Sequence, residues 1–577
     1  MATASTKSNN RKKNRRSEGA PPKITPPDVS RSPQTRDISN RTWLLCSLFI
    51  MAVAAILRLY NLSLVPFHHD EGVNGNFLVR LVREGYYHYD PANYHGPTLY
   101  YFSAIIPWIL RLLFGQSAQN NYGLNTVTVR LVPALFGLGT IWLVLLLRRR
   151  IGTVGTLCAA ALLAVSPGAV YLSRYFIHEM LFVFFTLGVV VAGLKYFEAG
   201  NPIYLLLASV SAALLFATKE TAVISVAVLA IALATTHLYL WLRNRFFHEN
   251  QRDRKQRRSE RGRKTSPQTS AVERLGGPTK LALLCLIAII VFVGVNVLFY
   301  SSFFTNYPKG IYDAVKTFEF WTKTGKEAHV HPITTYVWWL FRQEPPLIFF
   351  GTIGAALIVW KPRNAFALFS ALWAFGLLAA YSLIRYKTPW LVLNFVVPLA
   401  LISGYALQVL YDWGLGEIRL IIAIMLLAVA ISGYKTVDLN FFNYDNDAES
   451  YVYVYAHTRR EMLALVDEIE KVAERTKRGN KTGITIVSPD YWPLPWYFRD
   501  YKRVGYYQKV VPTTEPIIIG STGQEEEIKA TYGDQYQQVD SSKLNDPRIL
   551  PDRNPNGSFS LRPGVDLLLY VRRDVAR

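Results

Sequence analysis

The chain has 577 residues, of which 51% are hydrophobic and 14% aromatic, and its mean hydropathy is above zero. This composition is too apolar for an ordinary soluble protein and indicates many membrane spans. The net charge of +22 would fit nucleic-acid binding in a soluble chain. Here the basic residues concentrate in a few stretches typical of cytoplasmic segments, so we expect no nucleic-acid partner. Cys46, Cys158 and Cys285 all lie in apolar runs, which excludes a disulfide framework.

The N-terminal segment, 1–42, is rich in Ser, Pro, Lys and Arg. A segment of this kind cannot bury enough apolar surface to fold, so we predict a disordered basic tail on the cytoplasmic side. The tail is too long and too charged for a secretory signal peptide. The apolar run that follows, 43–60, is therefore expected to be an uncleaved first span.

Apolar runs recur along the chain as candidate spans. A transmembrane helix needs roughly 20 residues, so the shorter runs must recruit polar flanks. The twelve runs are 43–60, 99–114, 131–147, 153–171, 180–196, 203–218, 222–242, 281–300, 347–360, 365–383, 391–410 and 421–431.

The positions of Lys and Arg test this count, because these residues favour cytoplasmic loops near span ends. Four stretches are strongly basic: the tail, 148–150, 243–280 and 361–363. If all twelve runs crossed, 148–150 and 243–280 would lie outside. If 99–114 is instead re-entrant or interfacial, all four stretches become cytoplasmic. We therefore predict eleven spans in a transmembrane module, 43–435, with a basic cytoplasmic loop at 243–280.

This topology places every unusual polar cluster on the extracytoplasmic face. A first outer loop, 61–130, and a second large outer loop, 301–346, lie there, together with the chain after the last span. Ionisable residues at span ends are costly and are functional candidates. The candidates are Asp70 and Glu71 in HHDEG, His95 in YHGP, Arg174, Tyr175 and Glu179 in SRYFIHE, Lys219 in ATKE, and Arg385 and Lys387 in RYKTPW.

These residue types suit sugar transfer from a lipid-linked phosphate. A carboxylate such as Asp70 can take a proton from an acceptor hydroxyl as its oxygen attacks. Cationic side chains can hold a carrier phosphate and stabilise it as a leaving group. Aromatic residues such as Trp390 could stack on sugar or line a lipid groove. The pattern predicts transfer of a sugar from a polyprenyl-phosphate carrier at the outer face of a membrane.

Structural roles stay open for the same residues. Asp70 is also favoured at the start of a helix, and Arg174 could simply pair with Glu179. Lys219 and Lys387 could extend toward lipid headgroups. A divalent metal is a further option, with His69 and Glu179 as ligands among the carboxylates and histidines.

Taken in order, the motifs resemble those of integral-membrane glycosyltransferases of the GT-C class. HHDEG and YHGPTLYY resemble the first outer loop of protein O-mannosyltransferase-like and aminoarabinose-transferase-like enzymes. SRYFIHE resembles their second acidic loop, where the family more often has Asp than the Glu179 found here, and FATKE resembles their Thr-Lys element. DEGVNG, YHGP, KTPW and DYWPLPWYFRD together are most similar to the flippase activity-associated proteins of archaeal and bacterial N-glycosylation.

The resemblance implies a GT-C fold and an inverting hexosyl transfer from a polyprenyl-phosphate sugar to a lipid, glycan or protein acceptor. It implies that Asp70 is the base toward the acceptor, with Glu71 in a supporting or metal-contacting role and Glu179 as the acid of the second loop. Further residues match positions suited to the carrier phosphate: Arg174, Lys219 and Lys387. The subfamily label also supports an alternative, a non-catalytic protein that assists flipping or transport of lipid-linked sugars. A scaffold for envelope assembly is a third hypothesis.

The remaining segment, 436–577, is more polar and predicts a small extracytoplasmic α/β domain. The pattern of 449–478 is helical, and ITIVSP, PIIIGS and VDLLLYV are typical of short buried strands. DYWPLPWYFRD, 490–500, is dense in aromatic residues and prolines and predicts an irregular loop. Its aromatic residues either bind carbohydrate or pack against the membrane module.

Overall fold

The computed structural model describes residues 38–93, 95–115, 123–256, 273, 277–324, 329–413, 418–550 and 553–576. The predicted disordered tail lies outside the described residues apart from 38–42, and so does most of the basic loop after residue 256. From residue 37 onward the chain forms one compact unit.

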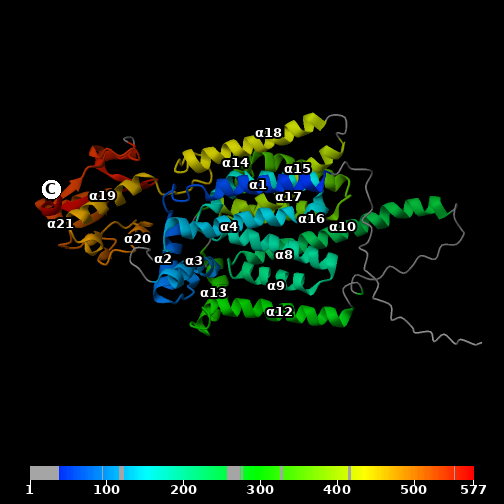
Figure 1. Cartoon of the computed structure of the whole chain (residues 1–577), viewed down its shortest axis with the longest axis horizontal. Helices are drawn as coiled ribbons and strands as arrows, with labels where there is room; N and C mark the ends of the chain where they lie inside the picture. Colours follow the sequence, from blue (N-terminus) through cyan, green and yellow to red (C-terminus); the bar gives the residue numbers. More distant parts are fainter. Residues whose placement is uncertain are drawn as a thin grey trace, which may run out of the picture. The chain divides into compact units, whose positions relative to one another are not determined.

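Helices make up most of the described chain before residue 443 (Figure 1). The first are α1 (Asn40–Leu59), α2 (His69–Glu84), α3 (Thr98–Phe114), α4 (Thr126–Leu145), α5 (Arg148–Ile151), α6 (Thr153–Ala164), α7 (Pro167–Ser173), α8 (Glu179–Ala199), α9 (Pro202–Phe216) and α10 (Ala222–Gln256). They are followed by α12 (Pro278–Tyr300), α13 (Lys309–Thr324), α14 (Thr335–Gln343), α15 (Pro345–Trp360), α16 (Ala365–Leu383), η3 (Pro389–Val392), α17 (Leu393–Trp413), α18 (Ile418–Val437) and the π-helical turn η4 (Asp438–Phe442).

All twelve predicted apolar runs are helical. Within the described residues, eight helices are long and apolar enough to cross a membrane, or up to ten if two bent pairs each count as one span. The shorter apolar helices are α9 and α3, and α3 is the run that loop charge sets apart as non-crossing. The chain is a polytopic α-helical membrane protein, as predicted.

The predicted span 153–171 is broken rather than continuous. Helices α6 and α7 meet at 58°, because Ser166 caps α7 and Pro167 occupies its first position. A proline is tolerated at the start of a helix but not in its interior. The break frees carbonyls at the end of α6. Arg58, fully buried in α1, donates to the carbonyls of Leu163 and Ala164 at 3.1 and 2.8 Å.

A second break separates α14 from α15, which meet at 115°. Glu344 lies between them and is fully buried. Its Oε1 accepts hydrogen bonds from the Ser166 hydroxyl at 2.8 Å and the Gly168 N–H at 2.9 Å. The carboxylate therefore satisfies the N-terminus of α7, where a negative charge is favourable, and it joins the two broken spans.

Beyond residue 443 the described chain forms a small α/β region. Its sheet has the order β2-β1-β3-β6-β4, with β5 also paired to β6; β1 runs parallel to β2 and β3, and β6 runs antiparallel to its neighbours. The strands are β1 (Ile484–Ile486), β2 (Val504–Tyr506), β3 (Ile517–Ser521), β4 (Tyr536–Val539), β5 (Phe559–Arg562) and β6 (Val565–Arg572), and the helices are α19 (Glu461–Arg475), α20 (Leu494–Tyr497), α21 (Glu525–Tyr532) and α22 (Arg573–Ala576).

The three predicted strand motifs contain β1, β3 and β6, whereas the helix predicted at 449–478 begins only at Glu461. The preceding stretch, YVYVYAHT, is rich in β-branched and aromatic residues that lose rotamer freedom in a helix. It runs instead as irregular chain. Below, this stretch is called the 451–458 segment.

The DYWPLPWYFRD stretch contacts α2. The Trp496 ring, 2% exposed, stacks on Phe67 with centroids 4.5 Å apart, and the Phe67 N–H donates to the Tyr497 hydroxyl at 2.9 Å. On α2, Gly72 and Gly75 leave room for this contact, since a Cβ at Gly75 would lie 2.6 Å from the Trp496 ring. At least one aromatic residue of the motif therefore packs against Phe67 and the face of α2 that carries Gly75.

Candidate active site

The start of α2 is fixed by a reciprocal capping arrangement. The His68 Nδ1 accepts the Asp70 N–H at 3.1 Å, and the Glu71 Oε2 accepts the His68 N–H at 3.0 Å. This satisfies N–H groups that a helix start otherwise leaves unpaired. Asp70 and Glu71 also lie in the first turn, where negative charge is favourable. The HHDE sequence therefore places its two acids on a rigid helix start.

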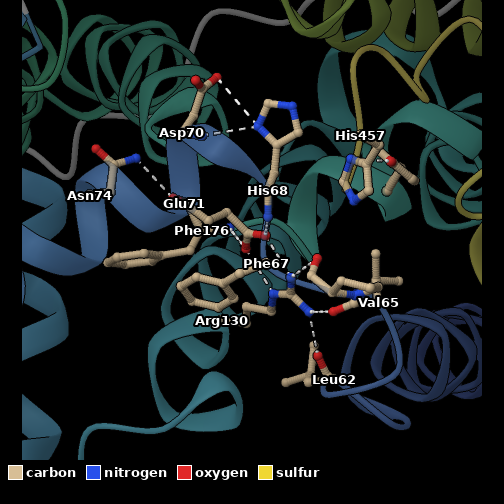
Figure 2. Close-up of polar contacts among 12 residues, drawn as sticks. Leu62, Val65, Phe67, His68, Asp70, Glu71, Asn74, Arg130, Phe176 and His457 are labelled. Atoms are coloured by element: carbon tan, nitrogen blue, oxygen red, sulfur yellow. Dashed lines mark hydrogen bonds and ion pairs between the residues drawn. The ribbon is translucent and has the colours of Figure 1, made fainter. Parts of the chain in front are cut away.

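Glu71 is enclosed and fully paired. Its carboxylate forms two bonds with Arg130 of α4, at 2.8 and 2.6 Å, and Oε1 also accepts the Phe176 N–H at 2.7 Å. Neither Glu71 nor Arg130 is more than 1% exposed. Arg130 donates as well to the carbonyls of Leu62, Val65 and Pro66 in the loop between α1 and α2. Figure 2 shows this guanidinium at the centre of the contacts, with Glu71 on one side and the loop carbonyls on the other.

Asp70 has different surroundings from its neighbour. Its side chain is 41% exposed, and its Oδ2 lies 3.8 Å from the Nδ1 of His68, the nitrogen that accepts the Asp70 N–H. In Figure 2 the Asp70 carboxylate points away from Arg130. Asp70 is therefore the accessible carboxylate of the pair, and Glu71 is the structural one.

The loop between α7 and α8 passes directly beneath α2. Asn74 donates to the Phe176 carbonyl at 3.0 Å and accepts the Tyr100 hydroxyl at 2.9 Å. The Tyr175 ring meets His68 edge-on at 5.2 Å, and its buried hydroxyl has no partner among the described residues. Burial raises the pKa of Tyr175 well above its ordinary value, and the nearby carboxylates of Asp70 and Glu71 raise it further. Tyr175 is thus a protonated phenol close to both acids.

Arg174, a predicted phosphate ligand, is engaged with the backbone. Its guanidinium donates to the carbonyls of Leu57, Tyr60 and Asn61 at the end of α1 and lies 4.7 Å over the Phe441 ring. A cation here complements the negative end of the helix dipole. Burial, with Arg130 nearby, lowers the pKa of Arg174 to about 10. The structure therefore places Arg174 as a helix cap.

Glu179 and Lys219 form a buried pair at 2.5 Å, each 5% exposed. Burial alone would lower the pKa of Lys219, but the carboxylates of Glu179 and Glu220 outweigh it and raise the pKa above its ordinary value. His95 contacts the same cluster, since its Nδ1 lies 3.3 Å from Glu220 Oε2 and its backbone bridges Lys219. The YHGP, SRYFIHE and ATKE motifs therefore meet, although Glu179 pairs with Lys219 rather than with Arg174.

His178 holds this cluster to the site around α2. Its ring lies 5.1 Å from that of His95 and 5.6 Å from that of Tyr100, and its Nε2 lies 3.0 Å from the Gly96 carbonyl. Burial, with His95 and Lys219 nearby, lowers the pKa of His178 well below its ordinary value. A neutral histidine thus packs between the first and second acidic loops.

The KTPW motif lies beside the part of the AHVH stretch that precedes α14. His331 N–H donates to the Arg385 carbonyl at 3.2 Å, and Lys387 N–H donates to the His329 carbonyl at 3.0 Å. The Lys387 ammonium is 3.3 Å from the His331 carbonyl and also donates to the Ile384 carbonyl, and its side chain is buried. The Arg385 side chain is exposed. These two cations have no carboxylate partner within the described part of the chain.

Sequence reasoning missed residues of the 451–458 segment that lie at the site. The Tyr455 hydroxyl is 2.5 Å from His329 Nδ1, its carbonyl is 3.2 Å from His68 Nε2, and its ring meets Trp390 edge-on at 6.1 Å. His457 is buried beside His68, and its Nδ1 bonds the Tyr171 hydroxyl at 3.1 Å. The repeated tyrosines in YVYVYAHT are the sequence signal that could have identified these residues as part of the site. This segment joins the α2 start to the KTPW motif.

A metal site from His69 and Glu179 does not fit these contacts. Within the described ranges, no group of three or more His, Cys, Asp or Glu residues is arranged to hold a metal ion. Arg562 donates to His69 Nδ1 at 3.1 Å, and Lys219 pairs with Glu179. A cation therefore already occupies a lone pair of each proposed ligand.

Comparison with known proteins supports a single fold class. The family described as dolichyl-phosphate-mannose-protein mannosyltransferase matches residues 102–249. No curated protein matches the chain in sequence. The structure is similar to that of ArnT from Cupriavidus metallidurans bound to undecaprenyl phosphate, at 14% identity and a TM-score of 0.57, over 92% of this chain and 98% of that chain.

Two further structures are similar. ArnT from Cupriavidus metallidurans in the apo state matches at 13% identity and a TM-score of 0.53, over 92% of this chain and 97% of that chain. The oligosaccharyltransferase AglB from Archaeoglobus fulgidus, in complex with an inhibitory peptide and a dolichol-phosphate, matches at 15% identity and a TM-score of 0.47, over 84% of this chain and 70% of that chain. The chain has the fold of GT-C class membrane glycosyltransferases, as its motifs predicted.

Proposed function

We propose that this GT-C-fold protein is a glycosyltransferase that moves a sugar from a polyprenyl-phosphate donor to an acceptor hydroxyl on the extracytoplasmic face. The observation that carries the proposal is the contrast within HHDE. The Glu71 carboxylate is bonded to Arg130 and to backbone N–H groups. The Asp70 carboxylate, one residue earlier, is 41% exposed and sits on a rigid helix start. A positioned base needs this combination of rigidity and access.

The reaction follows from these groups. The acceptor oxygen attacks the anomeric carbon of the donor sugar while Asp70 takes the hydroxyl proton. A bond forms between that carbon and the acceptor oxygen, and the bond from the carbon to the carrier phosphate oxygen breaks. The electron pair leaves on the phosphate, giving polyprenyl phosphate. A single displacement of this kind inverts the anomeric configuration.

Arg385 and Lys387 are our candidates for the carrier phosphate. Neither has a carboxylate partner among the described residues, and an unneutralised cation stabilises a leaving phosphate best. Arg385 is the better placed of the two, because its side chain is exposed, whereas Lys387 is 1% exposed and bonded to backbone carbonyls. Lys219 is less suited, because Glu179 already neutralises it. His95, beside Glu220, and Tyr175, beside His68, lie at the two acidic loops. That ArnT structure, which shares the fold, was obtained with undecaprenyl phosphate bound, and this supports a lipid phosphate as ligand here.

The test is sugar release by the purified protein in lipid, with a panel of polyprenyl-phosphate sugars. Release of free sugar or transfer to an acceptor from at least one donor is the expected result. If the protein binds these carriers but turns none over with any acceptor, it is instead a non-catalytic handler of lipid-linked sugars, and HHDE is a recognition site.

A further inference from the structure

The face of α2 that carries Asp70 is also contacted by a second polar cluster, which none of the steps above uses. His69, immediately before Asp70, accepts a hydrogen bond from Arg562 of β5. Arg562 in turn pairs with Asp490, whose side chain is 46% exposed. Burial lowers the pKa of His69 below its ordinary value; His68 and Arg562 add to this effect, and the carboxylates of Asp70 and Asp490 oppose it. A neutral imidazole, a guanidinium and a carboxylate therefore lie side by side next to the proposed base.

An aromatic strip leads away from this cluster. The Trp492 ring lies 6.1 Å from that of His69 and stacks on Tyr491 at 5.8 Å, and Tyr491 contacts Tyr506 at 5.0 Å. All three rings are partly exposed. Trp496 of the same motif differs, since it is buried against Phe67. The motif thus supplies one docking tryptophan and two partly exposed rings, and Tyr491 and Tyr506 also pack against the core of the α/β region.

The strip ends at a pocket. Tyr506 lines a cavity of about 250 Å³ together with Asn76, Tyr501 and Lys502, and the docking residue Trp496 and its neighbour Arg499 also line this cavity. Flat apolar rings beside a few fixed polar groups are the usual composition of a small-molecule site. Sugars match this composition, because their C–H faces cover aromatic rings while their hydroxyls bond carboxylate, guanidinium and amide groups.

We propose that the Trp492–Tyr491–Tyr506 strip, together with the Asp490–Arg562 pair, is the acceptor site, and that the acceptor is a carbohydrate chain whose terminal hydroxyl reaches Asp70. This inference rests on the proposed glycosyl transfer and adds the chemical class of the acceptor. We expect the acceptor to be longer than one sugar, because a strip of three rings accommodates several sugar units.

A matched pair of variants separates acceptor binding from docking of the C-terminal region. Asp490→Asn weakens the pair with Arg562. Asp500→Asn weakens an equivalent pair with Arg83, at the far end of α2. The two pairs are alike in exposure: 46% and 21% for Asp490 and Arg562, 39% and 24% for Asp500 and Arg83. A loss of oligosaccharide binding that is due only to weaker docking of the C-terminal region must appear in both variants.

The experiment measures binding of glucose, mannose and N-acetylglucosamine oligomers of one to four units to the full-length protein in lipid, without donor. We expect the longer oligomers of at least one series to bind more tightly than the monosaccharide. Trp492→Ala should weaken that binding about tenfold, corresponding to about 1.4 kcal/mol. Trp492→Phe should retain most of it, and Asp500→Asn should match wild type.

Two results would overturn the proposal: no binding of any oligomer to wild type, or equal losses in Asp490→Asn and Asp500→Asn. Melting temperatures of all variants identify any that fail to fold, and Trp492→Phe keeps the test open if Trp492→Ala does. Because donor is absent, these results are independent of turnover. Sugar release without acceptor, measured separately, tests the proposed function itself.

Discussion

Asp70 and Glu71 are adjacent in sequence but differ in exposure and in their bonding partners. Glu71 is fully buried and bound by Arg130, whereas Asp70 is 41% exposed. The two substitutions Glu71→Gln and Asp70→Asn remove one negative charge each and change little volume. Their consequences should therefore separate folding from catalysis.

Glu71→Gln should destabilise the protein by about 3–5 kcal/mol, because it leaves the buried Arg130 guanidinium without its counter-charge. Asp70→Asn should change stability by about 0.5 kcal/mol or less, as expected for a partly exposed residue. Thermal or denaturant unfolding in the same detergent checks both. Equal stability losses in the two variants would contradict the structural role of Glu71.

His457 gives a pH dependence of stability. Burial, with His68 and Arg130 nearby, lowers the pKa of His457 well below its ordinary value, so the folded protein holds this ring neutral. The unfolded chain takes up a proton as pH falls through about 6.5, and the folded state does not, so stability is lost on acidification. The loss approaches about 1.4 kcal/mol per pH unit for one group.

His457→Asn keeps an acceptor for the Tyr171 hydroxyl and removes this titration. Its melting temperature should fall less than that of wild type between pH 7 and pH 5. Parallel profiles for the two proteins would show that His457 does not titrate on unfolding.

At this scale the sequence identified the residue types but not their partners. The Glu71–Arg130 pair joins residues 59 positions apart, and nothing in either motif specifies it. Arg174 illustrates the same limit, since a cation at a span end suits a phosphate and a helix C-terminus equally well. Burial and pairing depend on the tertiary structure, so the choice between these roles does too.

Helix α2 connects the proposed base, Asp70, to the C-terminal region that docks beside it. One end carries Asp70, and the face with Gly72 and Gly75 accepts Pro493 and Trp496. The absence of a Cβ at both glycines lets these rings approach the helix backbone. Docking of the C-terminal region and placement of the base are therefore properties of one short helix.

Gly75→Val tests this coupling. A Cβ at this position would lie 2.6 Å from the Trp496 ring, so the ring must shift, at a cost of about 1–3 kcal/mol for overpacking. We expect lower thermal stability and lower turnover. Gly193→Ala is the control, because this helical glycine has open space around its Cβ position. A Gly75→Val protein as stable and active as the control would argue against the contact.

Element prediction succeeded where hydropathy dominates. Apolar runs became helices because a membrane leaves no alternative for backbone hydrogen bonds. Hydropathy alone does not reveal the break between α6 and α7, which is marked by Ser166 and Pro167, an ordinary helix start. The start of α19 was misplaced because helical periodicity at Glu461–Arg475 was extended across YVYVYAHT, whose conformation depends on its contacts with His68 and His329.

For the whole molecule, loop charge predicts a cytoplasmic N-terminus and an extracytoplasmic active site and C-terminal region. Cysteine labelling tests this orientation in intact cells, after Cys46, Cys158 and Cys285 are replaced by alanine. A membrane-impermeant maleimide should label Glu526→Cys, on exposed α21, but not Arg149→Cys in the basic turn. Labelling of Arg149→Cys but not of Glu526→Cys would show that the orientation is the reverse of the predicted one.

The GT-C architecture follows from the order of motifs and hydropathy, and the structural similarity to ArnT confirms it. The domain boundaries and the roles of individual site residues remain predictions. They rest on contacts between segments hundreds of positions apart, such as that of Phe67 with Tyr497.

The most direct measurement of the central claim compares wild type with Asp70→Asn in lipid, for carrier binding and for sugar release from the same polyprenyl-phosphate donor. If Asp70 is the base, the variant should bind the carrier with unchanged affinity and release or transfer sugar about 10²–10⁴-fold more slowly. Turnover close to that of wild type would contradict the assignment of Asp70 as the catalytic base.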